Sequence, residues 1–440
     1  MLINMSFIVK NARYVYTVNS TDQVLENTTV VVRDGVIEAI NPASLPTDIK
    51  EIYDGTDRLI MPGLINTHSH LAMVLLRGWA ESVNLDGFLE RVWAAEGAIM
   101  DKETCALGTE LGAAEAIQSG TTTVLDMYLN PDATHPAAIK VGLRHVTGPI
   151  FFDFPGLDGL EWDQRIELGK KWPVMLEAMG GPEVPIYFMP HGTYTDSPEH
   201  LSEVAELAQD LNARIHLHVS ETLNENNTVQ EQYKKSPTQA CEDTGILNVP
   251  TVFGHGVHLS ESDIAIAKMH GTAVAHCPSS NLKLGSGISD YLHYVKSGLR
   301  VGLGTDGCSS SNDLDMWPVM RLAANLISIK HSPSDVKPTQ LVRAATIDGA
   351  KAIGIDHLVG SIEVGKQADL IAIDLTALHL MPVHNVAALL VFAAGRSDVV
   401  DVWVAGKQVL AGRHLTTIDE KELRSRVSER IRVLDQVKVK

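Results

Sequence analysis

The stretch VFGHGVHLSESDIAIAKMHGTAVAH, from Val252 to His276, decides the fold class of this chain. Its first residues, Val252–His255, form a short apolar run that predicts a strand, and the amphipathic run Glu261–Met269 predicts a helix. A second strand is predicted over Ala273–His276. A strand, a helix and a strand in this order predict two parallel strands joined by a crossover helix.

The same alternation extends from about Met61 to Gly360. Further short apolar runs predict the strands Thr122–Leu125, Ile186–Met189, Ile215–His218 and Val301–Thr305. Longer amphipathic runs predict the helices Ala106–Gln118, Pro198–Leu211 and Thr339–Ala352. The number of units favours a closed barrel over an open sheet, so the α/β fold expected for residues 61–360 is a (β/α)8 TIM barrel.

Both ends of the chain have strand character instead. Before residue 60 the strand candidates are Phe7–Val9, Tyr14–Val18, Thr28–Val32 and Val36–Ile40, and after residue 360 they are Leu370–Ile373, Leu389–Val391, Val399–Val404 and Gln408–Leu410. Neither half looks able to close a core alone, so residues 1–60 and 361–415 are expected to form one composite β-sandwich domain. The segment 416–440 is expected to be a C-terminal helix, with its amphipathic pattern over Thr417–Val437.

Composition limits the classes of partner and the cellular setting that are expected for this chain. The 440 residues carry a formal net charge of -18, whereas a general nucleic-acid binder is usually basic. The four cysteines show no paired spacing, which favours a reducing, cytoplasmic setting. The segment Met1–Lys10 does not resemble a signal peptide, and the chain has no run of about 18 apolar residues, so no membrane span is predicted.

The first candidate site residues are His68 and His70, at the end of the apolar run that begins at Leu59. Residues i and i+2 of a strand point to the same side, so both imidazoles can reach one metal ion. Taken alone, the His68-Ser69-His70 pattern fits two surface histidines at a strand end as well as it fits a metal site.

Three further strand ends carry similar groups. His216 and His218 share one face of a strand and are followed by Glu221, His255 ends the next strand, and Asp306 ends another. Barrel enzymes build their active sites at these ends, so four such sites together indicate a metal centre. Imidazole and carboxylate ligands suit zinc, iron, nickel or manganese. A zinc deaminase of the cytidine type is not supported, because it would need a P-C-x-x-C motif.

The motif Pro62-Gly63-Leu64-Ile65-Asn66-Thr67-His68-Ser69-His70 resembles the amidohydrolase superfamily. Other motifs resemble its 5′-methylthioadenosine/S-adenosylhomocysteine deaminase branch, to which the s-triazine chlorohydrolases are close: Leu75-Leu76-Arg77-Gly78, Met189-Pro190-His191, His218-Val219-Ser220-Glu221, Ser280-Asn281-Leu282-Lys283-Leu284-Gly285-Ser286-Gly287 and Gly304-Thr305-Asp306-Gly307. The similarity covers nearly the whole chain.

The resemblance implies one divalent ion, with zinc expected and Fe2+ as the alternative. Its ligands would be His68, His70, His218 and Asp306. The resemblance favours His218 over His216, because Glu221 follows His218 at the matching offset. Binuclear relatives bridge two metals with a lysine, and the strand expected at residues 148–153 has none.

The resemblance also implies roles in catalysis and in substrate binding. Asp306 would move the proton of the attacking water, Glu221 would share a proton with the ring nitrogen, and His255 would hydrogen-bond the reacting centre. The substrate contacts would be Glu96 at the ribose hydroxyls, His191, Ser310 at the pocket edge and Trp93 as an apolar surface. A solvated helix face explains Glu96 equally well, and ordinary packing explains Trp93.

The activity implied is hydrolytic deamination of an adenine nucleoside: 5′-methylthioadenosine, adenosine or S-adenosylhomocysteine. Residues 148–162 contain no Arg or Lys to pair with a substrate carboxylate, which favours the first two. The alternatives are hydrolysis of another amino- or chloro-substituted heterocycle, such as an s-triazine or a pterin, and a non-catalytic scaffold. Scaffolds typically lose metal ligands, whereas every candidate is present here. The expected partner is a small molecule, and a homo-oligomer is allowed by analogy alone.

Overall fold

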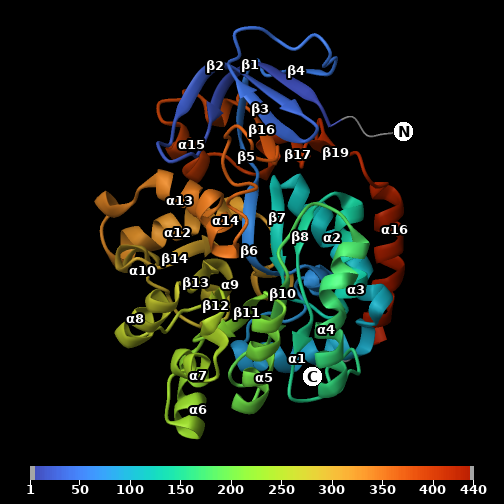
Figure 1. Ribbon diagram of the computed structural model, residues 1–440, viewed down its shortest axis with the longest axis vertical. Coiled ribbons are helices and arrows are strands. Elements are labelled where there is room, and N and C mark those ends of the chain that lie inside the picture. The colour runs from blue at the N-terminus through green and yellow to red at the C-terminus, as the bar shows by residue number, and fades with distance from the viewer. Residues whose placement is uncertain (1–4, 437–440) are drawn as a thin grey trace.

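Parallel strands run through the middle of the molecule (Figure 1), and the computed structural model, which describes residues 5–436, arranges them in two sheets. One sheet has the order β14-β13-β12-β11-β10-β9 and the other the order β15-β6-β7-β8. The strands are β6 Leu64–His70, β7 Thr121–Asp126, β8 Arg144–Val146, β9 Ile150–Phe151, β10 Tyr187–Pro190, β11 Arg214–Val219, β12 Thr251–His255, β13 Ala273–His276, β14 Arg300–Leu303 and β15 Asp306–Gly307.

The two parallel sheets adjoin at both edges. Only Gly304 and Thr305 separate β14 from β15, and only residues 147–149 separate β8 from β9. Near the first junction, the Thr67 hydroxyl of β6 donates to the Leu303 carbonyl of β14 at 2.9 Å. The chain therefore has the α/β architecture with parallel sheets that the alternating pattern predicts.

The stretch from Val252 to His276 folds as expected. β12 is followed by the helix α8, Glu261–His270, and then by β13. The helix begins after Ser260, whose hydroxyl accepts from the backbone N–H of Asp263 while the Asp263 carboxylate accepts from the N–H of Ser260. It ends at Gly271, which has a φ of +67°. Caps at both ends therefore define the helix that follows the strand end carrying His255.

Helices surround the parallel strands (Figure 1). Besides α8 they are α1 Leu85–Ile99, α2 Lys102–Gln118, α3 Pro131–Val141, α4 Trp162–Met179, α5 Pro198–Asp210, α6 Leu223–Tyr233, α7 Pro237–Asp243, α9 Pro278–Lys283, α10 Tyr291–Ser297, α11 Cys308–Ser311, α12 Met316–Lys330, α13 Pro338–Ala344, α14 Ile347–Ile353, α15 Val386–Phe392 and α16 Glu420–Arg430. None of the helices within residues 5–436 combines the length and the hydropathy needed to cross a bilayer.

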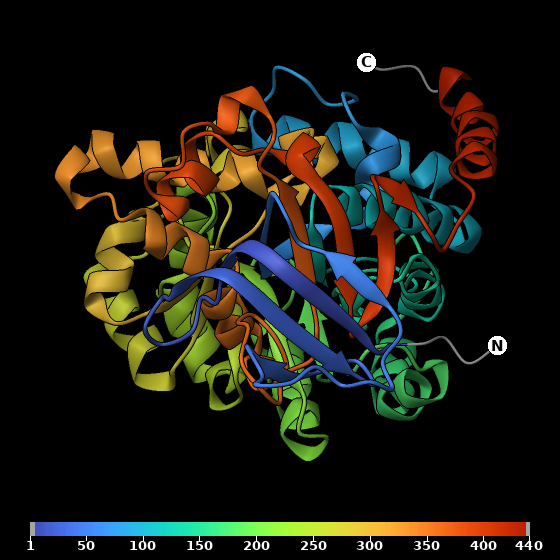
Figure 2. The ribbon, with the colours of Figure 1, turned by 90° about the horizontal axis from the view of Figure 1, so that it is seen from above.

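Strands from both chain ends share one sheet, which lies across one end of the parallel strands (Figures 1 and 2). Its order is β19-β18-β17-β16-β5-β1-β2-β3, with β4 paired to β1. The strands are β1 Phe7–Tyr16, β2 Val24–Arg33, β3 Val36–Ile40, β4 Ile52–Asp54, β5 Arg58–Pro62, β16 Leu370–Asp374, β17 Val399–Val404, β18 Lys407–Ala411 and β19 His414–Leu415. The antiparallel pair β5–β16 joins the two ends of the chain.

This end sheet has a small core of its own. Buried side chains from the first 60 residues, such as Phe7 and Val32, pack with Leu370 and Trp403 from the other end. The rings of Phe7 and Trp403 stack with centroids 5.3 Å apart. Each end of the chain therefore supplies part of the same core.

A buried ion pair links the end sheet to the parallel strands. The Arg144 guanidinium of β8 donates to both carboxylate oxygens of Asp369, at 3.1 and 2.9 Å. Both side chains are fully buried, at 0% and 1% exposure. Asp369 also accepts from the backbone N–H of Ala405, so this one carboxylate contacts both layers.

Two expectations about the last 80 residues need correction. The apolar run Leu389–Val391, predicted as a strand, lies in helix α15, which begins after Asn385, whose side chain accepts from the N–H of Ala388. The terminal helix predicted over 417–437 is shorter: α16 spans Glu420–Arg430 and a 3-10 turn, η6, spans Ile431–Gln436. Residues 437–440 lie outside the described part of the chain.

Candidate metal centre and pocket

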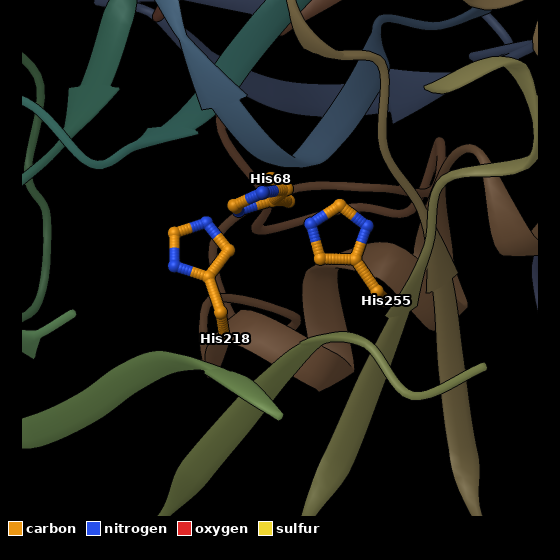
Figure 3. Close-up of side chains that lie close together, drawn as sticks. All are labelled: His68, His218 and His255. Carbon is orange, nitrogen blue, oxygen red and sulfur yellow. The ribbon is translucent and has the colours of Figure 1, made fainter. Parts of the chain in front are cut away.

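Five of the predicted residues meet where the parallel strands end. His68 and His70 close β6, His218 lies near the end of β11, His255 ends β12 and Asp306 opens β15. All five are buried, and Figure 3 shows the rings of His68, His218 and His255 facing a common space. His255 and Asp306 have φ values of +69° and +63°, a strained backbone typical of functional sites.

The donor atoms of these residues lie close together. Oδ1 of Asp306 is 3.1 Å from Nε2 of His70 and 3.3 Å from Nε2 of His68. Nε2 of His218 is 3.4 Å from Nε2 of His70. Two groups of three, both containing His68, have all their donor atoms within 4.8 Å of one another: His68, His70 and Asp306, and His68, His218 and His255. This spacing lets one ion contact donors from several strands.

Hydrogen bonds on the far side of the rings fix two tautomers. Nδ1 of His70 lies 2.6 Å from the carbonyl oxygen of Met127, and Nδ1 of His218 lies 2.8 Å from that of His191. A carbonyl oxygen only accepts, so each Nδ1 carries a hydrogen. In the neutral imidazole the lone pair is then on Nε2, which faces the cluster, and such outer partners orient metal-binding histidines in general.

His216 orients His68 in the same way. Nδ1 of His216 lies 2.9 Å from the carbonyl of Val252, so its Nε2 accepts from Nδ1 of His68 at 2.7 Å. His216 thereby uses both ring nitrogens within the protein. Nε2 of His68 is left buried and without a hydrogen-bond partner. A buried polar atom of this kind needs a partner, and a cation supplies one.

The charges of the cluster also suit a cation. Burial lowers the pKa of His68 to about 4 and holds that of His218 well below its usual range. Burial opposes protonation of His70 too, but the adjacent Asp306 carboxylate outweighs it and raises the pKa of His70 to about 9. Burial favours neutral Asp306, yet its contacts with His68 and His70 keep its pKa well below the usual range. Divalent metals bind neutral imidazoles and ionised carboxylates, so His68, His218 and Asp306 already have the binding form, whereas a metal ion would have to displace the extra proton of His70.

Two hydroxyls hold the second oxygen of Asp306. Ser280 and Ser310 donate to Oδ2 at 2.6 and 2.7 Å, while Oδ1 faces the histidines. Ser310, expected at the pocket edge, does line the pocket. No role was predicted for Ser280, although the motif that contains it carried part of the resemblance.

Glu221 and His255 lie beside the donor cluster. Nε2 of His255 is 3.7 Å from Oε2 of Glu221, and Nδ1 of His255 donates to Oδ1 of Asn281 at 2.9 Å. The Ser286 hydroxyl donates to the other oxygen of Glu221 at 3.4 Å. Burial raises the pKa of Glu221, whereas the pKa of Asp306 is lowered. Two carboxylates with opposite shifts are suited to opposite roles in proton transfer.

A pocket opens over the cluster, and the empty space in it and at its open mouth is about 1030 Å3. His70, His218, Glu221, His255 and Asp306 lie in its wall. Much of the remaining wall is apolar: Met73, Leu85, Phe88, Leu89, Val92, Trp93, Met127, Leu129, Ile150, Phe152, Phe154, Pro155, Leu157 and Leu284. No Lys or Arg is among the described residues that line it.

The predicted substrate contacts reach the same pocket. Glu96 of α1 is only 3% exposed, so the reading of a solvated helix face is wrong. Its carboxylate accepts from the Tyr128 hydroxyl at 2.6 Å, and burial raises its pKa to about 7. Trp93 is 40% exposed and lines the wall, as does His191, whose Nδ1 is 3.2 Å from the Thr195 hydroxyl.

Comparisons with known proteins agree with this architecture. The model of the amidohydrolase family matches residues 59–409. The chain is 36% identical over 409 residues to the 5-methylthioadenosine/S-adenosylhomocysteine deaminase of Moorella thermoacetica, covering 91% of this chain and 94% of that protein. A zinc-bound adenosine deaminase from Xanthomonas campestris superposes with a TM-score of 0.91 at 34% identity, over 98% of both chains. The zinc complex of an atrazine chlorohydrolase from Arthrobacter aurescens has a TM-score of 0.88 over 97% of this chain and 100% of that one, but at 22% identity it shares the fold alone.

Proposed function

The chain belongs to the amidohydrolase family, and from that premise we propose that it is a metal-dependent hydrolase that deaminates an adenine nucleoside and releases ammonia. The observation that carries the proposal is the convergence of the Nε2 atoms of His68, His70 and His218 with Asp306, directly beside a pocket whose wall includes His70, His218, Asp306 and Glu221. This arrangement supports hydrolytic chemistry at a carbon–nitrogen bond.

One divalent ion, zinc with Fe2+ as the alternative, would be held by His68, His70, His218 and Asp306. The unpartnered Nε2 of His68 and the outward hydrogen bonds of His70 and His218 support this set. When bound, such an ion lowers the pKa of a water molecule toward about 7 and so supplies a nucleophile at neutral pH.

Each side chain around the cluster has a separate role in proton transfer or hydrogen bonding. Asp306, ionised because its pKa is low, takes a proton from the attacking water as the new carbon–oxygen bond forms. Glu221, whose pKa is raised, gives its proton to the ring nitrogen next to the attacked carbon. The Nε2 lone pair of His255 accepts a hydrogen bond from the attacking hydroxyl, because its Nδ1 hydrogen is held by Asn281.

The second half of the reaction restores both carboxyl groups. Asp306 passes its proton to the amino nitrogen, the carbon–nitrogen bond breaks and ammonia leaves. The hydroxyl proton returns to Glu221 as the new carbonyl forms. The net change is one water consumed, one ammonia released and an amino group replaced by a carbonyl oxygen.

The substrate class rests on the names of the relatives and on the pocket wall. The two deaminases named above are named for adenosine, 5-methylthioadenosine or S-adenosylhomocysteine, and Glu96 is a buried acceptor suited to the ribose hydroxyls. We place His191, Ser310 and Trp93 around the same substrate. Without a Lys or Arg in the described wall, an apolar or uncharged 5′ group, as in 5′-methylthioadenosine or adenosine, fits better than the amino-acid end of S-adenosylhomocysteine.

We also propose that the two parallel sheets act as one closed (β/α)8 barrel over residues 61–360. The short breaks within β8–β9 and β14–β15 support closure, since each pair is one nearly continuous strand that belongs to both sheets. The shared core of residues 1–60 and 361–415 supports a composite end domain. Four free, buried cysteines are in keeping with a reducing, cytoplasmic setting.

Ultraviolet difference spectroscopy of the zinc-loaded protein tests the activity. With 5′-methylthioadenosine or adenosine we expect the adenine spectrum to change to that of hypoxanthine, with one ammonia released per substrate. S-Adenosylhomocysteine should be the poorest of the three substrates. No change with any of them, from protein that contains one metal ion per chain, would refute the nucleoside proposal and favour another amino-heterocycle.

A further inference from the structure

Two segments that are separate in the sequence supply hydrogen bonds around the reacting centre, and a third lines the pocket beside it. Helix α9 provides Ser280 to Asp306 and Asn281 to His255, and α11 provides Ser310 to Asp306. Helix α1 provides Glu96 to the pocket.

One ammonium group joins all three segments. Lys283, the last residue of α9, donates from Nζ to the carbonyl of Ser309 in α11 at 3.0 Å and to Oδ1 of Asn312, just after α11, at 2.9 Å. It also donates to Oε1 of Glu81, shortly before α1, at 2.9 Å. A lysine ammonium has three N–H donors, so all of them are used.

The partners of Lys283 are themselves fixed. The Asn312 amide donates to Oε1 of Glu81 at 2.9 Å, so the carboxylate and the amide close a ring around the ammonium. Arg91 of α1 donates to the backbone carbonyl of Glu81 at 3.0 Å, which carries the restraint into the helix. The Lys283 side chain is 21% exposed, and it is not among the residues that line the pocket.

We propose that Lys283 is a positioning residue that sets the placement of Ser280, Asn281 and Ser310 against Asp306 and His255 and ties them to the entry of the Glu96 helix. It acts through these groups and does not touch the substrate. Residues that orient groups around a metal centre typically change activity by about 10- to 100-fold when they are replaced.

The test compares Lys283→Met, Lys283→Arg and Lys171→Met. Lys171 is the matched control, because it forms an exposed ion pair with Glu167 on α4. With 5′-methylthioadenosine we expect kcat of Lys283→Met to fall by about 10- to 100-fold while one metal ion per chain is retained. Lys283→Arg should recover most of the rate, since its guanidinium can reach the same three acceptors, and Lys171→Met should match the parent protein.

The activity measurement rests on the proposed function. Hydrogen–deuterium exchange supplies a second measurement that is independent of it. Lys283→Met should speed exchange together in segments 78–84, 277–287 and 307–313, and Lys171→Met should not. Faster exchange in 277–287 alone, or a kcat within two-fold of the parent, would overturn the proposal. If Lys283→Met does not fold, Asn312→Ala removes one acceptor and should raise exchange in the same three segments. A parent protein that deaminates no nucleoside would refute the proposed function, while the exchange result would still decide the role of Lys283.

Discussion

At the scale of single residues, each imidazole of the proposed metal site has a hydrogen-bond partner on its far side. Met127, His191 and His216 hold Nδ1 of His70, His218 and His68 in turn. The period of two along a strand and the position at the strand end predicted that these histidines lie close together, but the choice of His218 over His216 came from the resemblance. The carbonyl partners at Met127 and His191 could not be predicted, because a backbone carbonyl leaves no trace in the sequence.

Glu221 gives the most direct test of the chemistry. Glu221→Gln keeps the shape of the side chain but removes the proton that the ring nitrogen needs. We expect kcat to fall by about 100- to 10,000-fold, the usual contribution of a general acid, with one metal ion per chain retained. Steady-state kinetics and metal analysis measure both quantities, with Glu167→Gln on α4 as a control. Loss of the metal along with activity would show that Glu221 helps to hold the ion.

Glu96 links substrate binding to stability. Burial raises its pKa from 4.5 to about 7, so between these pH values the folded protein holds a proton that the unfolded chain has released. Stability is therefore lost as the pH rises through this window and stays lower above it. Glu96→Gln removes this penalty, and we expect it to be more stable than the parent at pH 8, by up to about 3 kcal/mol, but not at pH 4.

Thermal unfolding of both proteins from pH 4 to pH 8 measures this difference. The same variant should have a higher KM for adenosine, because Glu96, which we propose as the acceptor for the ribose hydroxyls, has lost its charge. A variant that is less stable than the parent at pH 8 would contradict the assigned cause of the pKa shift.

At the scale of elements, the loop from β9 to α4 forms one wall of the pocket and supplies Phe152, Phe154, Pro155, Gly156 and Leu157. The sequence showed that residues 148–162, which include this loop, contain no Arg or Lys. Its position over the metal cluster follows from the strand that precedes it, since β9 lies beside β10 in the parallel sheet.

A single cation in this loop should broaden the substrate range. Leu157 is 41% exposed and lines the pocket, so an arginine fits there without burying a charge. Leu157→Arg should raise kcat/KM for S-adenosylhomocysteine relative to 5′-methylthioadenosine by about 10- to 100-fold, the effect of one charged hydrogen bond of about 1.5–3 kcal/mol. Competition assays with both substrates measure the ratio, and Leu157→Met controls for the change in shape. An unchanged ratio would place the 5′ end of the substrate elsewhere.

Helix α15 shows where reading the elements from sequence failed. Leu389–Val391 is a short apolar run, and such a run does not distinguish a buried helix from a strand. The residue that indicates a helix is Asn385, whose side chain caps the helix by accepting from the backbone N–H of Ala388. The strands of the Val252–His276 unit were predicted well because a capped helix separates them.

At the scale of the whole molecule, both chain ends meet in one sheet. Antiparallel β5 and β16 pair Pro62 with Leu370 and Arg58 with Asp374. Sequence composition suggested that the ends come together, but it could not give the strand order, because pairing between distant segments leaves no local pattern. The two-sheet sandwich therefore stays a prediction, while the shared sheet is observed.

The buried pair of Arg144 and Asp369 should stabilise the junction of the two layers. Arg144→Met leaves the Asp369 carboxylate buried without its partner, and we expect a loss of about 3–5 kcal/mol in the free energy of unfolding. The double variant Arg144→Met/Asp369→Asn should recover part of it, because no uncompensated charge remains. Urea unfolding of zinc-loaded protein measures the free energy of unfolding of the parent, the single variant and the double variant. Equal stability of the parent and the single variant would show that solvent reaches the carboxylate.

The contact between His68 and His216 also orders events in time. The two residues are 148 positions apart, and their strands β6 and β11 belong to different parallel sheets. A chain refolding from denaturant has no metal site until these distant strands have come together, and contacts of such long range form slowly. Metal uptake during refolding should therefore report when the two parallel sheets come together, and chelator added in the first moments should capture the ion without slowing the collapse of the individual strand–helix units.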